Sequence, residues 1–465
     1  MEHSRRYENQ LVLILFFTWG TVFLDRMSQL YLAPYFAPEF HLTTKQIGFL
    51  ASVVSVTWAL SGLFFGALSD RFGRRIVLIP GVILFSALSW LSGIAHSFEQ
   101  LLLIRALMGV AEGPCWAVIN AITEESSPPS RRGRNVGFVV SAGALVGLCA
   151  APILTTQVAS RWGWRWGFFV TGLPGILMAI LIWKFVREPK RTEEEGQRHG
   201  PVTVRGYFSI LRFRNVWLCC IGASGFISWL FLQNVFAPLY ITEVMHQPGT
   251  TAGFLLGAAG LGSFFIGLVF PGLSDRWGRK PTLLFLAFLS TLLPIALYLP
   301  FLYSHLWLLA AILFLTQGGQ AIAALIMVLV PAESVPPQFS ATAIGLATLV
   351  GEIIGATIAP AAGGAIAQQF GLGMPLLMAA ASTVVLFLAA LFIREPGTCK
   401  CGEPLDGQQC RRPKARQTSA RQARGTTHYS IQPQALAPLI DWMSLYGAFW
   451  WKRFDRLESL LKRMD

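Results

Sequence analysis

Four ionisable side chains stand inside long apolar stretches of the sequence and are the first candidates for chemistry. Asp25 and Arg26 fall in the first apolar run, and Arg105 and Glu112 fall in a later one. A charge at the centre of a membrane helix costs about 2.5–3.5 kcal/mol on insertion scales, so it usually serves a proton or ion pathway or is paired. A carboxylate can carry a proton and a guanidinium can bind an anion, so the four together could handle protons and an ionised ligand.

Spacing decides which of these side chains can meet. Arg105 and Glu112 are seven residues apart, two helical turns, which puts them on one helix face about 10 Å apart along the axis. The neighbours Asp25 and Arg26 must point to different sides of their helix. Opposite charges around one water-filled site can compensate each other. The alternative is that the four form buried structural ion pairs.

The composition indicates that lipid surrounds the elements that position these charges. Hydrophobic residues make up 54% of the 465 residues and charged residues 13%, whereas soluble proteins carry about 25% charged residues. Together with a mean hydropathy of +0.53, this argues against a disordered chain and against a soluble enzyme. The length suits about a dozen spans of roughly 20 apolar residues each. We therefore predict an all-α membrane protein with twelve transmembrane helices.

Apolar runs separated by short polar gaps give the expected spans and domains. The spans are 11–33, 45–68, 76–96, 99–123, 134–158, 166–187, 214–242, 251–273, 281–303, 306–332, 339–368 and 372–393. The domains are an N-terminal six-helix bundle (1–187), a cytoplasmic central loop (188–213), a C-terminal six-helix bundle (214–394) and a cytoplasmic tail (395–465). Polar composition predicts disorder over 397–435 of the tail. Apolar residues at spacings of three and four then predict an amphipathic helix, either on anionic lipid or packed on protein.

The net charge of +13 has a simpler explanation than nucleic-acid binding, which we do not expect. Lys and Arg concentrate in alternate loops, after the second, fourth and eighth spans and between the two sets of six. Positive charge accumulates on the cytoplasmic side of membrane proteins. We expect a multi-pass protein of the plasma (inner) membrane, with both termini cytoplasmic.

The chain contains an internal repeat. Three pairs of segments match at offsets of 205 to 208: FGALSDRFGRR at 65–75 with FPGLSDRWGRK at 270–280, EESSPPS at 124–130 with AESVPPQ at 332–338, and REP at 187–189 with REP at 394–396. Six spans per copy put both copies the same way up, so the repeat is parallel.

The doubled loop segment has chemistry of its own. Its glycines permit a tight turn between helices, and its aspartates can cap a helix or pair with arginine. Such a cluster could latch the two halves in one conformation, or it could be a topology signal only. The gating candidates are Asp70, Arg71, Gly73, Arg74, Asp275, Arg276, Gly278 and Arg279.

The doubled motif, the twelve spans, the long central loop and the repeat together resemble the major facilitator superfamily, over residues 11 to about 395. This resemblance implies alternating access around a midplane site between the two halves. An enzyme is not expected, because the sequence has no metal cluster, nucleophile elbow or phosphate loop in a suitable context. No cofactor or metal is expected either: Cys399, Cys401 and Cys410 have no His at ligand spacing.

The repeat also compares the two halves at the charged positions. At an offset of 208, Asp25, Arg26, Arg105 and Glu112 fall on Gln233, Asn234, Leu313 and Gln320. Polarity is kept at three of the four places and charge at none. We infer a division of labour in which the first half handles charge and Gln233, Asn234 and Gln320 offer neutral hydrogen bonds to a substrate.

FLDR at 23–26 and LLLIRALMGVAEGP at 101–114 resemble the anion:cation symporter branch of the superfamily. The resemblance implies proton coupling by Asp25 and Glu112 and anion binding by Arg26 and Arg105, in a proton-coupled symporter of a small organic carboxylate. The expected partners are that anion, protons and the lipid bilayer, with the chain acting as a monomer. Sugar-acid members tend to have a polar amide where this chain has Ala144, which argues for a more apolar carboxylate.

Other readings stay open. GEIIGATIAPAAGG at 351–364 resembles a drug/proton antiporter motif, although that motif belongs in the fifth span. Glu352 within it is either a third functional acid or a group that faces water or the next helix. A passive facilitator and a membrane sensor that transports nothing are further alternatives.

Overall fold

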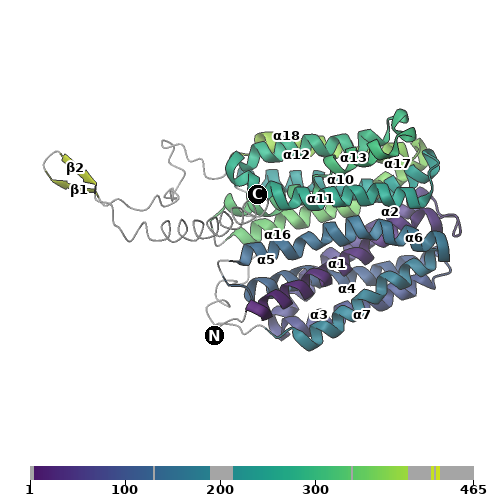
Figure 1. The fold of residues 1–465 in the computed structure, drawn as a ribbon, viewed down its shortest axis with the longest axis horizontal. Helices are drawn as coiled ribbons and strands as arrows, with labels where there is room; N and C mark the ends of the chain where they lie inside the picture. Colours follow the sequence, from purple (N-terminus) through teal and green to yellow (C-terminus); the bar gives the residue numbers. More distant parts are fainter. Residues whose placement is uncertain are drawn as a thin grey trace, which may run out of the picture. The chain divides into compact units, whose positions relative to one another are not determined.

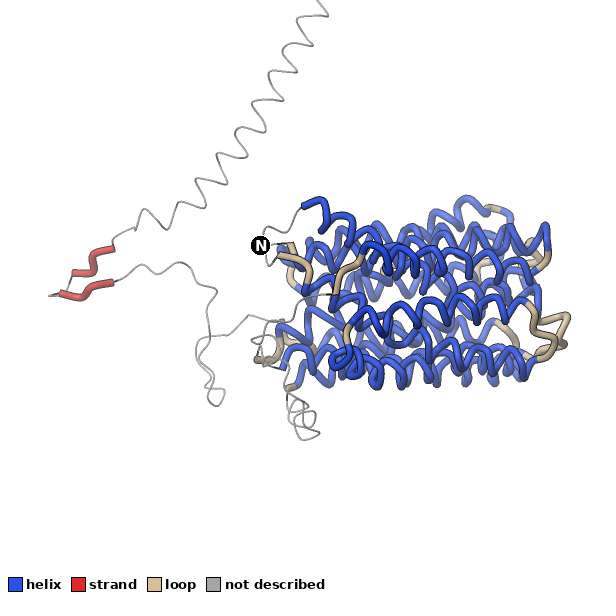
Figure 2. The backbone as a smooth tube through the Cα atoms, turned by 90° about the horizontal axis from the view of Figure 1, so that it is seen from below, coloured by secondary structure: helices blue, strands red, loops and turns tan. Residues whose placement is uncertain are grey.

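The computed structural model describes residues 5–128, 131–188, 213–336, 339–395, 420–423 and 426–429. The chain divides into two compact units, Met1–Gly397 and Thr398–Asp465. The first unit is a bundle of long helices that run side by side (Figure 1), and a view turned by 90° shows the same alignment (Figure 2).

Residues 5–188 form the first half of the bundle. Its elements are α1 (Arg5–Phe36), α2 (Thr44–Phe72), α3 (Arg74–Gly93), α4 (Phe98–Glu125), α5 (Arg132–Ala142), η1 (Gly143–Ala150), α6 (Ala151–Trp162) and α7 (Trp164–Phe185). The segments α5, η1 and α6 form one continuous span, whose central part is a π-helix.

Residues 213–395 form the second half. Its elements are α10 (Arg214–Leu239), η2 (Tyr240–Val244), α11 (Gly249–Trp277), α12 (Arg279–Leu297), η3 (Pro300–Ser304), α13 (Leu306–Thr316), α14 (Gly319–Ala323), η4 (Ala324–Leu329), α15 (Val330–Glu333), α16 (Ser340–Gly351), η6 (Glu352–Ile358), α17 (Ala359–Phe370) and α18 (Gly373–Phe392). Several of these are pieces of one span: α10 with η2, α13 through α15, and α16 with η6 and α17.

The prediction of a twelve-span, all-α membrane protein is confirmed. Eleven described helices are long and apolar enough to cross a membrane. The 29-residue α2 is the twelfth long helix among the described residues. Gly73 and Gly278 end α2 and α11 with φ of +114° and +98°, which is the left-handed turn region that favours glycine.

The parallel repeat is visible in matching hydrogen bonds at one end of the bundle, which we call the motif end because it carries Gly73 and Gly278. Glu188 accepts hydrogen bonds from the backbone N–H groups of Arg74 and Arg75, at the start of α3. Glu395 does the same for the first two residues of α12. A carboxylate at a helix N-terminus satisfies free N–H groups and complements the helix dipole.

The two halves contact each other toward the opposite end, which we call the seam end because it carries Thr44 and Gly249. Thr44 Oγ1 in α2 donates to the carbonyl of Gly364 in α17, at 3.1 Å. A Cβ atom added to Gly260 of α11 would lie 2.1 Å from the carbonyl carbon and oxygen of Leu148 in η1. Backbones this close need glycine, as in tightly packed membrane helices.

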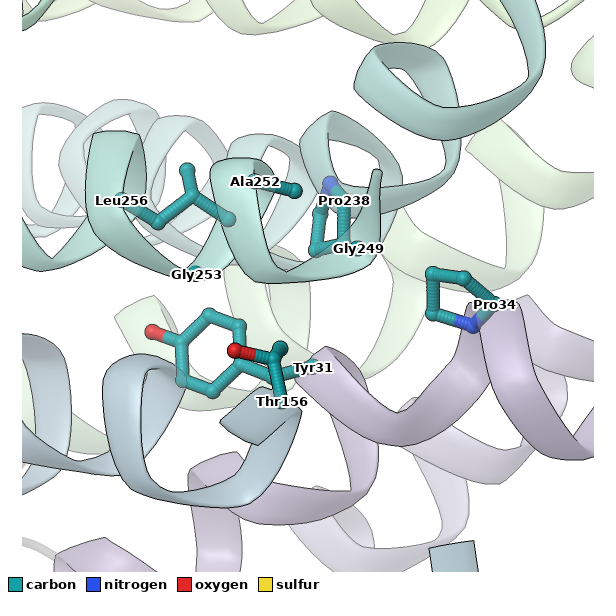
Figure 3. A pocket seen from close by; sticks show the side chains of 8 residues that line it. All are labelled: Tyr31, Pro34, Thr156, Pro238, Gly249, Ala252, Gly253 and Leu256. Atoms are coloured by element: carbon teal, nitrogen blue, oxygen red, sulfur yellow. The ribbon is translucent and has the colours of Figure 1, made fainter. Parts of the chain in front are cut away.

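Side chains of both halves also meet at one small pocket of this contact region. Tyr31 and Thr156 of the first half face Gly253 and Leu256 of α11 (Figure 3). The space between them is too narrow for a water molecule. The described contacts at Thr44 and Gly260 therefore close the bundle at the seam end.

Replacing Gly260 by valine is expected to open the seam, because the new side chain would overlap backbone atoms of η1. Overpacking of this kind costs about 1–3 kcal/mol, enough to disfavour the arrangement closed at the seam end. Distances between spin labels on α2 and α17 at that end should lengthen. The matched control is Gly272→Val on the same helix, where an added Cβ has no neighbour within 4 Å. Equal distance distributions in the two variants would contradict the seam as described.

The second unit contains one described element pair. Strands β1 (Ala420–Ala423) and β2 (Thr426–Tyr429) pair antiparallel, with Ala420 opposite Tyr429. The Thr and Tyr residues of β2 favour a strand, and the disorder expected over 397–435 stays a prediction for the rest of that segment. Of the predicted central loop (188–213), residues 189–212 lie outside the described residues, as does the predicted amphipathic helix after 435.

Candidate functional site

The neighbours Asp25 and Arg26 of α1 point to different sides, as the sequence predicts. Asp25 is fully buried inside the first half. Its Oδ1 accepts hydrogen bonds from Ser89 of α3 and, at 3.4 Å, from Thr171 Oγ1 of α7. Its Oδ2 has no hydrogen-bond partner among the described residues. One carboxylate oxygen is thus held by two hydroxyls while the other is left for a proton or another donor.

Arg105 lies beside Asp25 in the interior of the first half. The two charges interact electrostatically. The Arg105 guanidinium stacks 4.7 Å from the ring centre of Phe168, and its Nη1 lies 2.9 Å from the Met108 sulfur. Its Nε and Nη2 have no hydrogen-bond partner among the described residues. A fully buried guanidinium with free donors can bind an anion only if one reaches it.

Glu112 is fully buried on the same helix as Arg105. Neither of its carboxylate oxygens has a hydrogen-bond partner in the described part of the chain. Asp25, Arg26 and Arg105 all act on it electrostatically. A buried carboxylate without hydrogen bonds is costly when ionised, so such a group is suited to carry a proton. The described residues contain no group of three His, Cys, Asp or Glu side chains that could hold a metal ion.

Arg26 points the other way, toward the second half. Its Nη2 lies 3.3 Å from Ser55 Oγ of α2 and 3.3 Å from Glu352 Oε2 of η6. Its guanidinium also lies 4.8 Å from the ring centre of Trp58 and 5.2 Å from that of Phe231. Arg26 therefore lies where α1, α2, α10 and η6 meet, close to two aromatic rings.

The inferred division of labour needs a correction at this point. The second half lacks charge at the four matched positions, but it supplies Glu352 to the site from a fifth position. At the offset of 208, Glu352 falls on Ala144 of the first half. These residues lie at the starts of the two π-helical segments η6 and η1, and π-helical turns are frequent at functional sites.

The three predicted amides have different surroundings. Asn234 accepts a hydrogen bond from Tyr31 Oη across the two halves, at 2.9 Å. Gln233 is buried inside the second half, and its Oε1 has no partner among the described residues. Gln320 is half-buried, and its side chain lies over Gly267 of α11. Of the three, only Asn234 forms a described hydrogen bond between the halves.

Gln317 and Trp229 are candidates that the repeat comparison missed. Gln317 Oε1 and Trp229 Nε1 are both buried without a partner among the described residues. Gln317 lies in a break between α13, which ends at Thr316, and α14, which begins at Gly319. The signal in the sequence is the pair of glycines that follows Gln317. Broken helices expose such groups at transporter midplanes.

The described contacts of the loop motif stay within each half. Arg74 Nη2 donates to Glu125 at 2.8 Å, and Arg279 Nη2 donates to Glu333 at 2.7 Å. Arg279 also pairs with Asp275, at 2.7 Å, and Arg276 is exposed. The side chains of Asp70 and Arg71 lie outside the description. The described part of the motif therefore braces the ends of helices within each half instead of joining the halves.

Comparison with known proteins gives the family. The sequence profile of the Major Facilitator Superfamily matches residues 15–356 and 234–450. The chain belongs to the major facilitator superfamily. It is accordingly an integral, multi-pass membrane transport protein. Among solved structures, a bacterial homolog of the human lysosomal transporter Spinster, inward-facing and unoccupied, has a TM-score of 0.66 at 21% identity and covers 84% of this chain and 96% of its own. A D-xylose–proton symporter has a TM-score of 0.62 at 17% identity and covers 83% and 97%.

Three curated relatives of this superfamily transporter have names that specify a cargo. A probable 4-methylmuconolactone transporter of Cupriavidus pinatubonensis is 29% identical over 73% of this chain and 79% of the relative. A cis,cis-muconate transport protein of Acinetobacter baylyi is 29% identical over 77% of this chain and 87% of the relative. A probable L-galactonate transporter of Escherichia coli is 28% identical over 55% and 60%.

Proposed function

We propose that this transporter couples the uptake of a small organic carboxylate to the uptake of protons by alternating access. The observation that carries the proposal is the buried group Asp25, Arg26, Arg105 and Glu112, whose members retain hydrogen-bonding atoms without partners among the described residues. Buried charged groups whose hydrogen-bonding atoms lack partners are suited to accept protons and an anion. In structural ion pairs, these atoms would bond to one another.

Arg26 is the proposed contact for the substrate carboxylate. It lies between the two halves, with Glu352 and Ser55 as its polar neighbours. A guanidinium binds a carboxylate through two parallel hydrogen bonds. The nearby rings of Trp58 and Phe231 favour a flat, unsaturated carbon skeleton over a polyhydroxylated one. The muconate and muconolactone relatives fit this preference better than the galactonate relative does.

Asp25 and Glu112 are the proposed proton carriers. A proton on Glu112 removes a buried negative charge that no described hydrogen bond stabilises. The change from the outward-facing to the inward-facing state then has a lower electrostatic cost, because charge in a low-dielectric region is expensive. Arg105 holds Asp25 by charge and remains inside the first half, so its proposed role shifts from direct substrate contact to the proton pair.

The distribution of Lys and Arg supports a cytoplasmic motif end. With that orientation, closure at the seam end corresponds to an inward-facing state. The proposed sequence is substrate and proton loading from outside, closure of the seam between η1 and α11, and release at the motif end.

The test is uptake of labelled cis,cis-muconate, 4-methylmuconolactone and L-galactonate into vesicles that contain the purified full-length transporter. An outside-acid pH gradient should drive accumulation of muconate above the external concentration. Accumulation only with the gradient reversed would indicate antiport, and equilibration that ignores the gradient would indicate a facilitator. Binding without flux would indicate a sensor. Each of these three results would contradict the proposed symport.

A further inference from the structure

Glu352 occupies the position on Arg26 that a substrate carboxylate would take. Its Oε2 lies 3.3 Å from Arg26 Nη2, and the guanidinium is also close to the rings of Trp58 and Phe231. Both side chains are nearly closed to solvent, with exposed fractions of 4% for Arg26 and 12% for Glu352. A second carboxylate could bind to Nη2 in the same way only by displacing Glu352 from it.

The surroundings of Glu352 contain one cation in contact with it. From α1 it contacts Arg26, and Arg26 in turn contacts the neutral Ser55 of α2. From α10, Ile227 and Ser228 pack on η6. The adjoining helices α16 and α17 contain no ionisable side chain. Glu112 of α4 acts on Arg26 electrostatically from the other side. Within the described residues, the state of Glu352 is therefore governed by what Arg26 binds.

We propose that Glu352 is an internal competitor for the substrate: it holds Arg26 while the site is empty, and it takes up a proton and withdraws when a carboxylate binds there. The inference rests on the proposed function and adds a third proton carrier to it. The exchange is balanced, because one substrate carboxylate replaces one protein carboxylate on the guanidinium. A proton from solvent forms an O–H bond on Glu352, so Arg26 is balanced by one carboxylate both before and after the exchange.

This exchange also links occupancy to the contact between the halves. The Arg26–Glu352 pair joins α1 of the first half to η6 of the second, across 326 positions of sequence. When the substrate carries Arg26 and Glu352 is neutral, the ion pair between the halves is lost. A site that is empty and deprotonated keeps the pair instead. Such differential stabilisation of two states is what allows a ligand to shift a conformational equilibrium.

The test is the number of protons taken up per cis,cis-muconate bound, measured by titration calorimetry in buffers of different ionisation enthalpy. The purified full-length native protein is compared with Glu352→Gln, Glu352→Asp and the control Glu243→Gln, an exposed glutamate of η2. Glu352→Gln should take up about one proton fewer per ligand than the native protein. In the pH range where Glu352 is ionised, the native affinity should therefore fall by about tenfold more per pH unit than that of the variant, so the variant should bind more tightly at high pH.

The other variants make the result decisive. Glu352→Asp keeps an ionisable group and should retain the native proton count, as should Glu243→Gln. An unchanged proton count in Glu352→Gln, with muconate bound, would overturn this inference and leave the proposed function standing. Weaker binding of muconate by Glu352→Gln at high pH would overturn it as well, because the removal of a competing carboxylate should raise the affinity of Arg26 for the substrate. If the native protein binds no muconate and no other carboxylate of the uptake panel, the proposed function fails and this inference fails with it.

Discussion

Replacing Glu112 by glutamine is expected to abolish the accumulation of substrate under an outside-acid gradient. The amide keeps the size of the side chain and resembles a carboxyl group that never releases its proton. Net transport requires each proton carrier to release its proton, so the cycle stops even though Asp25 and Glu352 remain. Gradient-driven uptake should fall by at least about a hundredfold, the range over which removal of a positioned proton-transfer group acts. Exchange of labelled for unlabelled substrate across the membrane should remain, because it needs no net proton movement.

Two features make this variant informative. Glu112 has no described hydrogen-bond partner to lose, so the substitution does not leave another buried group unpaired. Glu99 on the same helix is exposed, and Glu99→Gln is the matched control, with uptake expected to stay at the native level. Acid-driven accumulation that survives in Glu112→Gln would show that the proton is carried elsewhere.

Replacing Arg26 by glutamine is expected to remove substrate binding. The guanidinium provides charge-assisted hydrogen bonds worth about 1.5–3 kcal/mol each, so the loss of one bond should lower the affinity by about 10- to 150-fold and the loss of both by more. It would also leave Glu352 buried without its cation, which adds a stability cost. Both uptake and exchange should be lost, in contrast to Glu112→Gln, where exchange remains. Binding by calorimetry and flux in vesicles measure the two effects separately.

Arg26→Lys separates charge from shape. Lysine keeps the positive charge but lacks the planar fork that binds a carboxylate in two places and stacks between rings. Arg26→Lys should fold as stably as the native protein, because it keeps a cation beside Glu352. Its affinity for the substrate should lie between those of Arg26→Gln and the native protein. Arg161 of α6 is exposed, and Arg161→Gln is the control for loss of a positive charge. Native affinity in Arg26→Gln would mean that the carboxylate binds at another cation.

The sequence predicts most of the fold, because its signals act within one helix or one repeat. Apolar runs gave the twelve spans, and the repeated loops gave the parallel halves. The opposite directions of Asp25 and Arg26 follow from helix geometry alone. Their burial follows from the cost of charge in lipid. None of these predictions depends on which helices contact each other.

The contacts between halves could not be predicted in the same way. Arg26 meets Glu352 across 326 residues, and no periodicity in either helix indicates that the two spans meet. The repeat comparison pointed to Gln320, but the break after Thr316 interrupts the helical phase of that span. Gln317 is consequently buried while Gln320 is half-buried. An offset between repeats matches positions in the sequence only. It does not show that a helix is interrupted in one of the two copies.

The loop motif is a case in which the residues were identified but their partners were not. The glycine turns follow from local conformation, and Gly73 and Gly278 adopt the positive φ that this requires. The partners Glu125 and Glu333 come from other helices of the same half. Sequence spacing alone left a latch between the halves open, and the described contacts favour bracing within each half.

The most direct measurement of the central claim records substrate and proton movement together in the same vesicles. A gradient of cis,cis-muconate is imposed with no initial pH difference, and a dye reports internal pH. Coupled symport predicts that inward muconate flux acidifies the interior and that Glu112→Gln eliminates the proton signal. Muconate entry at the native rate with no proton movement in the native protein would contradict coupling through Asp25 and Glu112.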